Sequence, residues 1–363
     1  MRIALIAPLV TRIKEPQAGG SQAFVADLGR GLAGRGHSID VYAATGSEIE
    51  DVNLVDLGID SELLIPALYR AGARERSDPR ITEKAFATVY AHVADGIYDV
   101  VHNHAYDAPA ISLASGLHSA VLHTLHLPPT MPVVEALLEA EQYAHPPAVA
   151  TVSEFCAAAW RAFARIDATL RPHVPTSRIP WSDQPGEGAI FAGRLSPEKG
   201  AAEAIEIAHA AGLAIDVYGD PYDPDYVRRS IDPWRDTPHV RIHRALPRPE
   251  LWEKMARASV VVCPVRWDEP FGMVAAEAQA CGTPVVASLR GGLPENVIDG
   301  LSGLFVDPSD VDGASKVLTR ALALSRSACR RHAETHLDLG SSLDAHEAIY
   351  AHLIATRGAS VCA

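Results

Sequence analysis

Residues 269–277 read EPFGMVAAE, and this stretch places two carboxylates around the expected start of a helix. The apolar run VVVCPV at 260–265 precedes it and CGTP at 281–284 follows, so the local order is strand, loop, helix and stop. Pro270 is expected where the first helical turn begins, because its missing N–H has no helical partner there. The stretch therefore predicts a buried strand that leads through a short loop into a helix.

The expected helix start offers hydrogen-bond donors and acceptors together. Gly272 lets a ligand approach the backbone closely, and the N–H groups of Phe271, Gly272 and Met273 carry the positive end of the helix dipole. Glu269 precedes these donors, and Glu277 lies about two turns inside the helix. A solvated surface pair is the alternative, but Glu277 lies in an otherwise apolar stretch. The arrangement suits a diphosphate attached to a hydroxyl-bearing sugar.

Composition limits the class of protein. The chain has 363 residues, of which 48% are hydrophobic, and this length suits about two domains with real cores. The net charge of −13 and the lack of a long basic run argue against nucleic-acid and anionic-membrane binding. Five cysteines without a CxxC pair argue against a disulfide framework or zinc ribbon, and a reducing cytoplasm is expected. We expect neither a signal peptide nor a membrane span.

Short β-rich runs alternate with helical segments in both halves of the chain. Strands are expected in the first half at 3–8, 38–44, 98–104, 120–127 and 148–152, with amphipathic segments at 21–35 and 80–95. Strands are expected in the second half at 189–193, 213–219, 240–245, 260–265 and 284–288. Runs such as VVVCPV are apolar throughout, as strands covered by helices on both faces require. The predicted fold class is α/β, with two Rossmann-like, doubly wound parallel sheets.

The domain boundaries follow from composition. Residues 1–170 form the first expected domain and residues 189–340 the second, while 171–188 are rich in Pro, Gly and Ser and form the expected linker. We expect residues 341–363 to form a C-terminal helix that crosses back to the first domain. Ligands of open parallel sheets bind beyond the carboxyl ends of the strands, so the two domains are expected to face each other across a cleft.

Two glycine- or cation-bearing loops follow expected strands. Gly19 and Gly20 close the loop after the first strand, where backbone N–H groups could reach a phosphate, and Ser21 is the expected N-cap of the next helix. A flexible turn is the alternative for this glycine pair. Arg194 and Lys199 bracket the turn after the strand at 189–193, and two cations there predict an anion site in an acidic chain.

Histidines and aspartates raise the possibility of a metal site. His102 and His104 project to one face of a strand, and His123 and His126 end another. No carboxylate or cysteine accompanies them at ligand spacing, so we expect one histidine to face the cleft and the others to pack or hydrogen-bond. The segment Asp223-Pro224-Asp225 imitates an Asp-x-Asp motif but lies in a turn-rich setting, which favours a loop and helix cap. We therefore expect no metal ligands.

Three motifs resemble a known family. GRLSPEKG at 193–200, EPFGMVAAEAQACGTPVVA at 269–287 and GGLPENVIDGLSGLFVD at 291–307 look like the donor half of the retaining glycosyltransferases of family GT4, which have the GT-B fold. The Gly19-Gly20 loop and the strand end TLH at 124–126 match the looser pattern of the acceptor half. The resemblance spans nearly the whole chain and is more specific in the second half.

The resemblance implies a role for each matching residue. It assigns Glu277 to the ribose and Glu269 to the donor sugar. The backbone at 271–273 would lie beside sugar and phosphate. Arg194 and Lys199 would neutralise the diphosphate, helped by Gly20, and His126 would touch the sugar near the reacting carbon. One departure is that the segment after the linker reads HVPTSRIPWSDQP at 173–185, where many members carry Asn-Gly-Ile/Val-Asp.

The implied reaction is retaining transfer of a sugar from a nucleoside diphosphate, with UDP and GDP as favoured carriers, to a hydroxyl of a small-molecule, glycan or lipid-linked acceptor. Fixed donors would stabilise the leaving diphosphate without a metal or another cofactor. Two alternatives share the architecture: a non-hydrolysing sugar-nucleotide epimerase, and a nucleotide-sugar-binding protein without turnover. An epimerase would need catalytic acid and base groups on both sides of the sugar.

Overall fold

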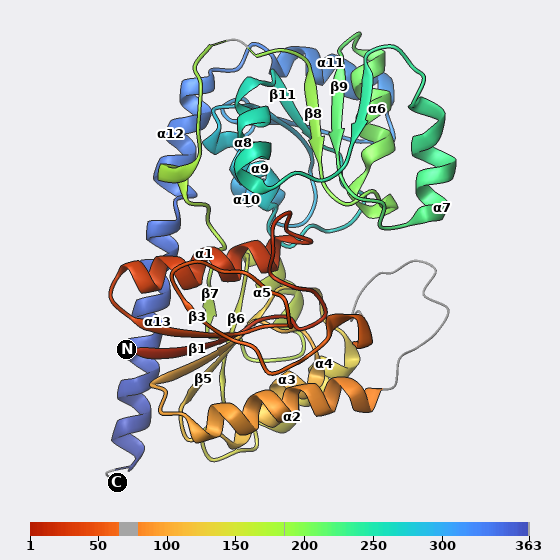
Figure 1. Ribbon diagram of the computed structural model, residues 1–363. Coiled ribbons are helices and arrows are strands. Elements are labelled where there is room, and N and C mark those ends of the chain that lie inside the picture. Colours follow the sequence, from red (N-terminus) through yellow and green to blue (C-terminus); the bar gives the residue numbers. More distant parts are fainter. Residues whose placement is uncertain (65–78, 185, 362–363) are drawn as a thin grey trace. The chain divides into compact units, whose positions relative to one another are not determined.

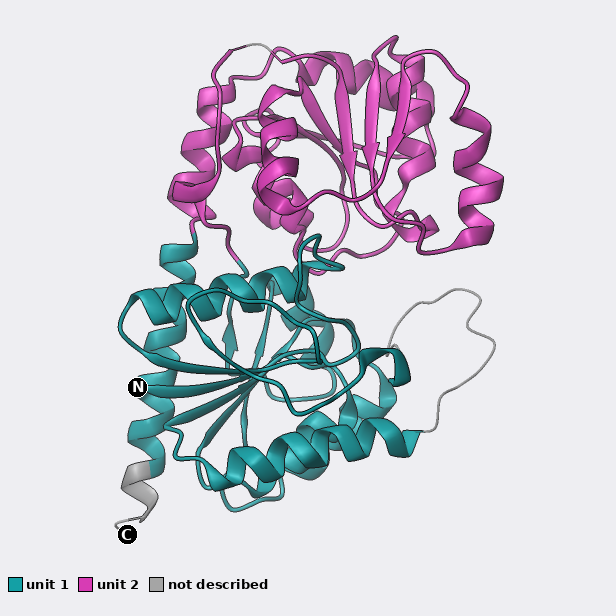
Figure 2. Ribbon diagram, viewed as in Figure 1, with its two compact units in different colours: residues 1–69, 73–172, 339–363 teal, residues 70–72, 173–338 magenta. Residues whose placement is uncertain are grey.

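The computed structural model describes residues 1–64, 79–184 and 186–361. They divide into two compact units, shown in two colours in Figure 2. Unit 1 holds the described residues up to Pro172 together with those from Leu339 onward, and unit 2 holds His173 to Asp338. The helix α13 (Leu339–Val361) thus belongs with the first half of the chain.

Unit 1 contains a seven-stranded parallel sheet among the described residues, in the order β3-β2-β1-β4-β5-β6-β7. Its strands are β1 (Arg2–Ile6), β2 (Ser38–Tyr42), β3 (Asn53–Val55), β4 (Val100–Asn103), β5 (Ala120–Leu125), β6 (Ala148–Thr151) and β7 (Ala168–Thr169). Besides α13, its helices are α1 (Gly20–Gly34), η1 (Ser61–Leu63), α2 (Pro79–Asp95), α3 (Ala108–Ser112), η2 (Leu113–Gly116), α4 (Met131–Ala140) and α5 (Glu154–Trp160).

Alternation along β1 explains how this sheet is covered on both faces. Ile3 and Leu5 pack with side chains of α1 and α13, whereas Ala4 and Ile6 pack with side chains of α2 and α3. Helices α1 and α2 accordingly lie on opposite faces of the sheet (Figure 1). Both faces of the strand are therefore buried, as the apolar runs predict.

Unit 2 contains a six-stranded parallel sheet among the described residues, in the order β10-β9-β8-β11-β12-β13. Its strands are β8 (Ala189–Ala192), β9 (Ile215–Tyr218), β10 (Val240–His243), β11 (Val260–Cys263), β12 (Val285–Ser288) and β13 (Gly303–Val306). Its helices are η3 (Thr176–Arg178), η4 (Pro197–Lys199), α6 (Ala201–Ala210), α7 (Pro224–Tyr226), η5 (Val227–Ile231), η6 (Asp232–Trp234), α8 (Arg248–Arg257), α9 (Met273–Ala280), α10 (Leu293–Asn296), α11 (Val311–Ala321) and α12 (Arg326–His336).

The two sheets share one connectivity. In each, the chain winds outward through three strands, returns to the middle and winds outward in the other direction, which is the order of a doubly wound Rossmann fold. The strand order reverses between β1 and β4 in unit 1 and between β8 and β11 in unit 2. The predicted α/β class with two Rossmann-like sheets is confirmed, and these two reversal points are where such folds bind ligands.

Much of the segment expected as a linker is built into unit 2. Two buried arginines of α12 hold it: Arg330 donates to the carbonyl groups of Thr176 and Ile179, and Arg326 donates to that of Ser182. Further hydrogen bonds from the two arginines reach the carbonyl groups of Ala256, Ala258 and Ala280. The division between the units therefore falls at 172–173 and 338–339 and not across all of 171–188.

Candidate functional site

The reversal point of unit 2 brings together two motifs that are far apart in sequence. Lys199 ends the turn after β8, and Glu269 lies in the loop after β11, the strand beside β8. The Nζ atom of Lys199 lies 2.6 Å from Oε2 of Glu269, and Nε1 of Trp267 donates to the same oxygen at 2.7 Å. The Lys199 ammonium also lies 4.9 Å from the centre of the Trp267 ring. The structure thus places the predicted cation and the predicted sugar-binding carboxylate in one cluster.

Arg194 lies in the same turn and keeps a donor available. Its guanidinium lies 4.7 Å from the centre of the Tyr222 ring, and its Nη2 atom is 3.6 Å from Oε1 of Glu198. Its Nε atom is buried and makes no hydrogen bond within the described part of the chain. A buried N–H without an acceptor is unfavourable, so an anion that reached this nitrogen would gain a strong hydrogen bond.

The helix start at the quoted stretch differs from the sequence expectation. Helix α9 begins at Met273, with Gly272 as its N-cap at φ 96°, so Pro270 precedes the helix and the expected start there is wrong. The left-handed conformation at Gly272 turns the chain into the helix, and a Cβ there would lie 2.6 Å from Leu293. The N–H groups of Phe271, Gly272 and Met273 have no acceptor among the described residues. These donors could therefore bind an anion, and their assignment to a ligand stays a prediction.

A glycine pair supports the loop that carries Glu269. The N–H of Gly292 donates to the carbonyl oxygen of Glu269 at 2.6 Å. A Cβ on Gly291 would lie 2.2 Å from that oxygen, and one on Gly292 would lie 2.4 Å from the carbonyl oxygen of Pro270. The GGLPEN segment therefore lets the chain after β12 pack directly against the loop after β11.

Glu277 is buried on α9 and forms an ion pair that the sequence did not reveal. Nε of Arg248 donates to Oε1 of Glu277 at 2.8 Å, and both side chains are buried. The Arg248 guanidinium also lies 4.9 Å from the centre of the Trp252 ring. The apolar surroundings of Glu277 in the sequence predict a partner for this carboxylate, and the expected partner was a ligand. In the structure the partner is a protein side chain, Arg248 in the first turn of α8.

The reversal point of unit 1 is built from the loops after β1 and β4. Helix α1 begins at Gly20 with Gly19 as its extended N-cap, so Ser21 is inside the helix and its expected role as N-cap is wrong. The buried Gln22 donates to Thr11 Oγ1 at 2.5 Å and to the Tyr106 hydroxyl at 3.2 Å. This side chain joins the two loops, and the N-cap of α1, Gly19, has no side chain that could cap the helix.

The four histidines that the sequence singled out, His102, His104, His123 and His126, are buried, and each is hydrogen-bonded to another of them or to a neighbour. His126 follows β5, and its Nε2 lies 3.0 Å from Nδ1 of His104. His102 bonds Thr124, and Nδ1 of His123 lies 3.1 Å from the amide nitrogen of Asn103. Among the described residues, no group of three or more His, Cys, Asp or Glu side chains is arranged to hold a metal. The expectation that most of these histidines pack or hydrogen-bond is confirmed.

Asp107 is a further candidate site residue, which the sequence did not indicate. It precedes α3 at the same edge of the sheet, it is buried, and its Oδ2 has no hydrogen-bond partner among the described residues. Burial raises its pKa to about 7. One aspartate in a loop gives no sequence signal, because the loss of solvent that shifts the pKa arises only in the folded chain.

The Asp-x-Asp segment is a helix cap, as predicted. Oδ1 of Asp223 accepts hydrogen bonds from the N–H groups of Asp225 and Tyr226 at 3.0 Å each, which closes the start of α7. Asp225 forms an exposed pair with Arg228 at 2.5 Å. Both carboxylates therefore have partners within the same segment of the chain.

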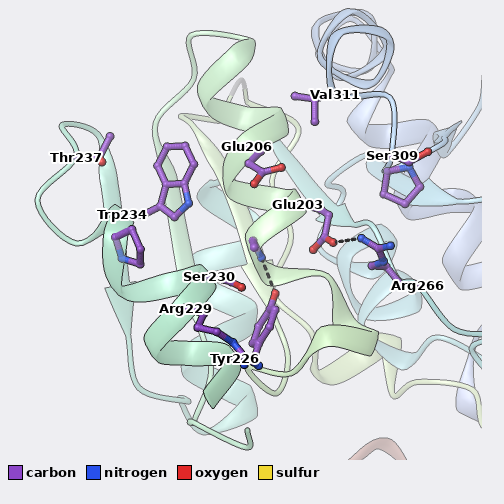
Figure 3. Close-up of a pocket in the computed structure, with 13 residues that line it drawn as sticks. Glu203, Glu206, Tyr226, Arg229, Ser230, Trp234, Thr237, Arg266, Ser309 and Val311 are labelled. Carbon is purple, nitrogen blue, oxygen red and sulfur yellow. Dashed lines mark hydrogen bonds and ion pairs between the residues drawn. The ribbon is translucent and has the colours of Figure 1, made fainter. Parts of the chain in front are cut away.

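Unit 2 also carries an open hollow of about 680 Å³ beside α6 (Figure 3). Oε1 of Glu203 lies 2.7 Å from Nη1 of Arg266 on its wall, and the Tyr226 hydroxyl accepts from the Ala202 N–H at 2.9 Å. None of the predicted site residues lines this hollow. We therefore place the candidate site at the carboxyl ends of β8 and β11 instead.

Known proteins are similar to this chain in sequence. The model described as Glycosyl transferases group 1 matches residues 182–336, and that described as Glycosyltransferase Family 4 matches residues 18–175. A D-inositol 3-phosphate glycosyltransferase of Kribbella flavida is 30% identical over 87% of this chain and 86% of its own length. One from Mycolicibacterium paratuberculosis is 29% identical over 92% and 86%.

Solved structures show the same fold. Sucrose-phosphate synthase from Thermosynechococcus elongatus has a TM-score of 0.76 at 19% identity and covers 98% of this chain and 99% of its own. WaaG, a glycosyltransferase involved in lipopolysaccharide biosynthesis, has a TM-score of 0.69 at 16% identity, covering 96% and 99%. The fold, the sequence matches and the cation-bearing edge of unit 2 define a glycosyltransferase with the GT-B fold. Within this class, the chain belongs to glycosyltransferase family 4.

The helices of the described residues can be compared with the length and polarity that a membrane span requires. Within residues 1–64, 79–184 and 186–361, every helix is too short or too polar to cross a bilayer.

Proposed function

We propose that this glycosyltransferase moves a sugar from a nucleoside diphosphate to an acceptor hydroxyl with retention of the anomeric configuration and without an obligatory metal. The observation that carries the donor half of the proposal is the cluster at the carboxyl ends of β8 and β11. It combines the cations Arg194 and Lys199 with the unused N–H groups before α9. Charge of this kind is what a leaving diphosphate requires.

The ion pair between Lys199 and Glu269 suggests how the donor binds. Their side chains are 19% and 16% exposed, so a ligand can reach both. A diphosphate would draw the ammonium toward itself and release the carboxylate oxygen to accept from a sugar hydroxyl. Each charged group would then exchange a protein partner for a ligand partner, which avoids leaving either one unpaired.

The chemical step needs stabilisation of two opposite charges. As the sugar–phosphate bond breaks, negative charge grows on the diphosphate, and Arg194, Lys199 and the N-terminus of α9 would stabilise it. In the proposed mechanism the departing phosphate takes the proton of the acceptor hydroxyl on the same face of the sugar. Because these groups supply the countercharge, a divalent cation is not obligatory.

The donor base and the acceptor are separate parts of the proposal. UDP and GDP are the carriers we would test first, followed by ADP and TDP. The curated relatives are D-inositol 3-phosphate glycosyltransferases, so inositol 3-phosphate is the first acceptor to assay, followed by small-molecule, glycan and lipid-linked acceptors. Gly20 and His126 of unit 1 are assigned to the phosphate and donor sugar in this proposal.

Incubation with a labelled nucleotide sugar and an acceptor tests the proposal. A transferase releases the nucleoside diphosphate and yields a glycosylated acceptor whose early product keeps the donor configuration by NMR. Recovery of an isomerised nucleotide sugar would instead identify an epimerase, and tight binding without either product would identify a binding protein. An inverted product would overturn the retaining mechanism.

Metal independence has its own test. Turnover should persist in EDTA, because the proposed countercharges belong to the protein. Complete loss of turnover in EDTA, restored by magnesium or manganese, would contradict this part of the proposal.

A further inference from the structure

Four histidine rings form a buried cluster on the face of the unit 1 sheet that α1 and α13 cover. This histidine cluster comprises His102, His104, His126 and His346. The ring centres of His102 and His104 are 3.9 Å apart, and those of His104 and His126 are 5.2 Å apart. Phe24 of α1 packs 6.0 and 6.4 Å from the rings of His104 and His126. The rings are therefore held by packing as well as by hydrogen bonds.

Burial favours the neutral form of three rings in this cluster, those of His102, His104 and His126. Burial, followed by the neighbouring histidines, lowers the pKa of His102 and His104 well below the usual range of histidine. Burial and the nearby His346 lower the pKa of His126 to about 3. A neutral imidazole carries one N–H and one lone pair, so each hydrogen bond fixes what the other nitrogen can do.

The contact between His104 and His126 allows two proton arrangements. His104 Nδ1 lies 3.0 Å from His126 Nε2, and one of these nitrogens must donate to the other. His104 Nε2 is buried and has no partner within the described residues. If His126 donated, His104 would carry its proton on Nε2 as a buried N–H without an acceptor, which folded proteins rarely tolerate. If His104 donates from Nδ1, its Nε2 carries a lone pair instead of an N–H. A buried lone pair without a donor is the less costly of the two arrangements.

We propose that His104 is a positioning residue, which donates from Nδ1 to Nε2 of His126 and so fixes His126 as the neutral tautomer with its proton on Nδ1. The inference rests on the proposed function, in which His126 contacts the donor sugar. His126 Nδ1 makes no hydrogen bond within the described part of the chain, so this N–H can donate to a sugar oxygen. In this tautomer Nδ1 cannot accept a proton, and the acceptor's proton must go elsewhere.

His102 packs against His104 and restricts the orientation of its ring. Its Nδ1 lies 2.6 Å from the hydroxyl of Tyr350 on α13, and its Nε2 lies 2.7 Å from Thr124 Oγ1. The ring is thereby fixed at both nitrogens, and it packs against the His104 ring with the two centres 3.9 Å apart and the planes tilted by 39°. A rotation of His104 away from His126 would require the His102 ring to move too, and this packing keeps the donor aimed at His126.

NMR of histidine ring nitrogens in the wild-type protein tests the tautomer without any assay of activity. With histidine labelled in ¹⁵N and His126 assigned by substitution, the one-bond and two-bond couplings should show a protonated Nδ1 and an unprotonated Nε2. A proton on Nε2 of His126 would overturn the proposal. If no donor supports turnover, the proposed function fails, while this measurement still decides the hydrogen bond.

Two substitutions separate positioning from packing. His104→Phe keeps a ring of similar size but removes the donor, and His104→Asn is smaller but presents an amide N–H near the position of Nδ1. We expect His104→Phe to lower kcat about tenfold with little change in donor KM, and His104→Asn to stay within about threefold of wild type. A residue needed only for packing would give the opposite order, with Phe at least as active as Asn.

His123→Phe is the matched control. His123 is also buried on β5, and burial lowers its pKa to about 3, yet its side chain alternates to the other face of the sheet and bonds Asn103. This variant should keep kcat within about twofold of wild type. If the His123 and His104 variants lost turnover equally, the effect would come from loss of buried histidine and the positioning role would be wrong.

Discussion

The carboxyl edges of the two sheets share one connectivity but carry different side chains. In unit 2 the edge carries formal charges, with Lys199 paired to Glu269 and Arg194 beside Glu198. In unit 1 the corresponding edge is lined by neutral histidines. One connectivity therefore carries a charged cluster in one unit and buried histidines in the other, because these side chains come largely from the loops and not from the strand order.

Within unit 2, two ion pairs differ in a way that separates binding from stability. The pair of Lys199 and Glu269 is partly exposed and can exchange its partners for a ligand. The pair of Arg248 and Glu277 is buried, and removing one member leaves an uncompensated charge inside the protein. The first pair should affect mainly turnover and the second mainly folding.

Glu277→Ala should give the largest effect on stability. It leaves the buried Arg248 without its carboxylate, and we expect a loss of about 3–5 kcal/mol in the free energy of unfolding. Glu277→Gln, which keeps the shape and one oxygen, should lose less. Urea unfolding of the two variants, followed by calorimetric titration of nucleotide into whichever is folded, checks this. A Glu277→Ala variant as stable as wild type would show that the pair has little structural role.

Lys199→Ala and Arg194→Ala should change turnover more than stability. Each removes one group that stabilises charge on the leaving diphosphate, and we expect kcat to fall by about 10²–10³-fold at saturating donor. The exposed Lys254 of α8 offers a control, and Lys254→Ala should be near wild type. Near-normal kcat in both site variants would remove the anion site from the mechanism.

Asp107 should make the stability of the protein depend on pH. Its pKa is raised by burial to about 7, so the folded state holds this proton more tightly than the unfolded chain does. The stabilising contribution is present at low pH and is lost as pH rises toward 7 and beyond. We expect Asp107→Asn to reduce the loss of stability between pH 5 and pH 8 by about 2–3 kcal/mol. Identical pH profiles for the two proteins would contradict the assignment.

Substitutions in the Asp223-Pro224-Asp225 segment should give the smallest effects, and Asp223→Ala the larger of the two. It removes the cap of α7, so we expect a loss of about 1 kcal/mol in the free energy of unfolding, with turnover unchanged. Asp225→Ala removes only an exposed ion pair and should cost less than about 0.5 kcal/mol. Loss of turnover in either variant would reopen the reading of this segment as a metal motif.

The sequence predicted the fold well because buried parallel strands have a strong local signal. Every expected strand is present, and the observed strands end within a few residues of the predicted bounds. The three strands not predicted, β3, β7 and β13, are all at sheet edges. An edge strand pairs on one side only, and β3 and β7 are also short and partly exposed, so their apolar pattern is weak.

Local motifs predicted positions in the site but not its pairings. The sequence identified Arg194, Lys199 and Glu269, yet nothing local indicates that Lys199 meets a carboxylate 70 positions away. Arg248 was missed for the same reason, since its partner lies on another helix. The contact between Trp267 and Glu269 could have been predicted from the sequence, because Trp267 precedes Glu269 by only two residues in the same loop. Long-range pairings depend on strand order, which the motifs alone do not give.

Calorimetric titration of nucleoside diphosphates tests the central claim most directly, namely that the charged edge of unit 2 holds the diphosphate of the donor. At least one of UDP, GDP, ADP and TDP should bind wild type at one site per chain, and Arg194→Ala and Lys199→Ala should each weaken that binding about tenfold or more. Absence of binding by all four nucleotides, or equal affinity in wild type and both variants, would contradict the account.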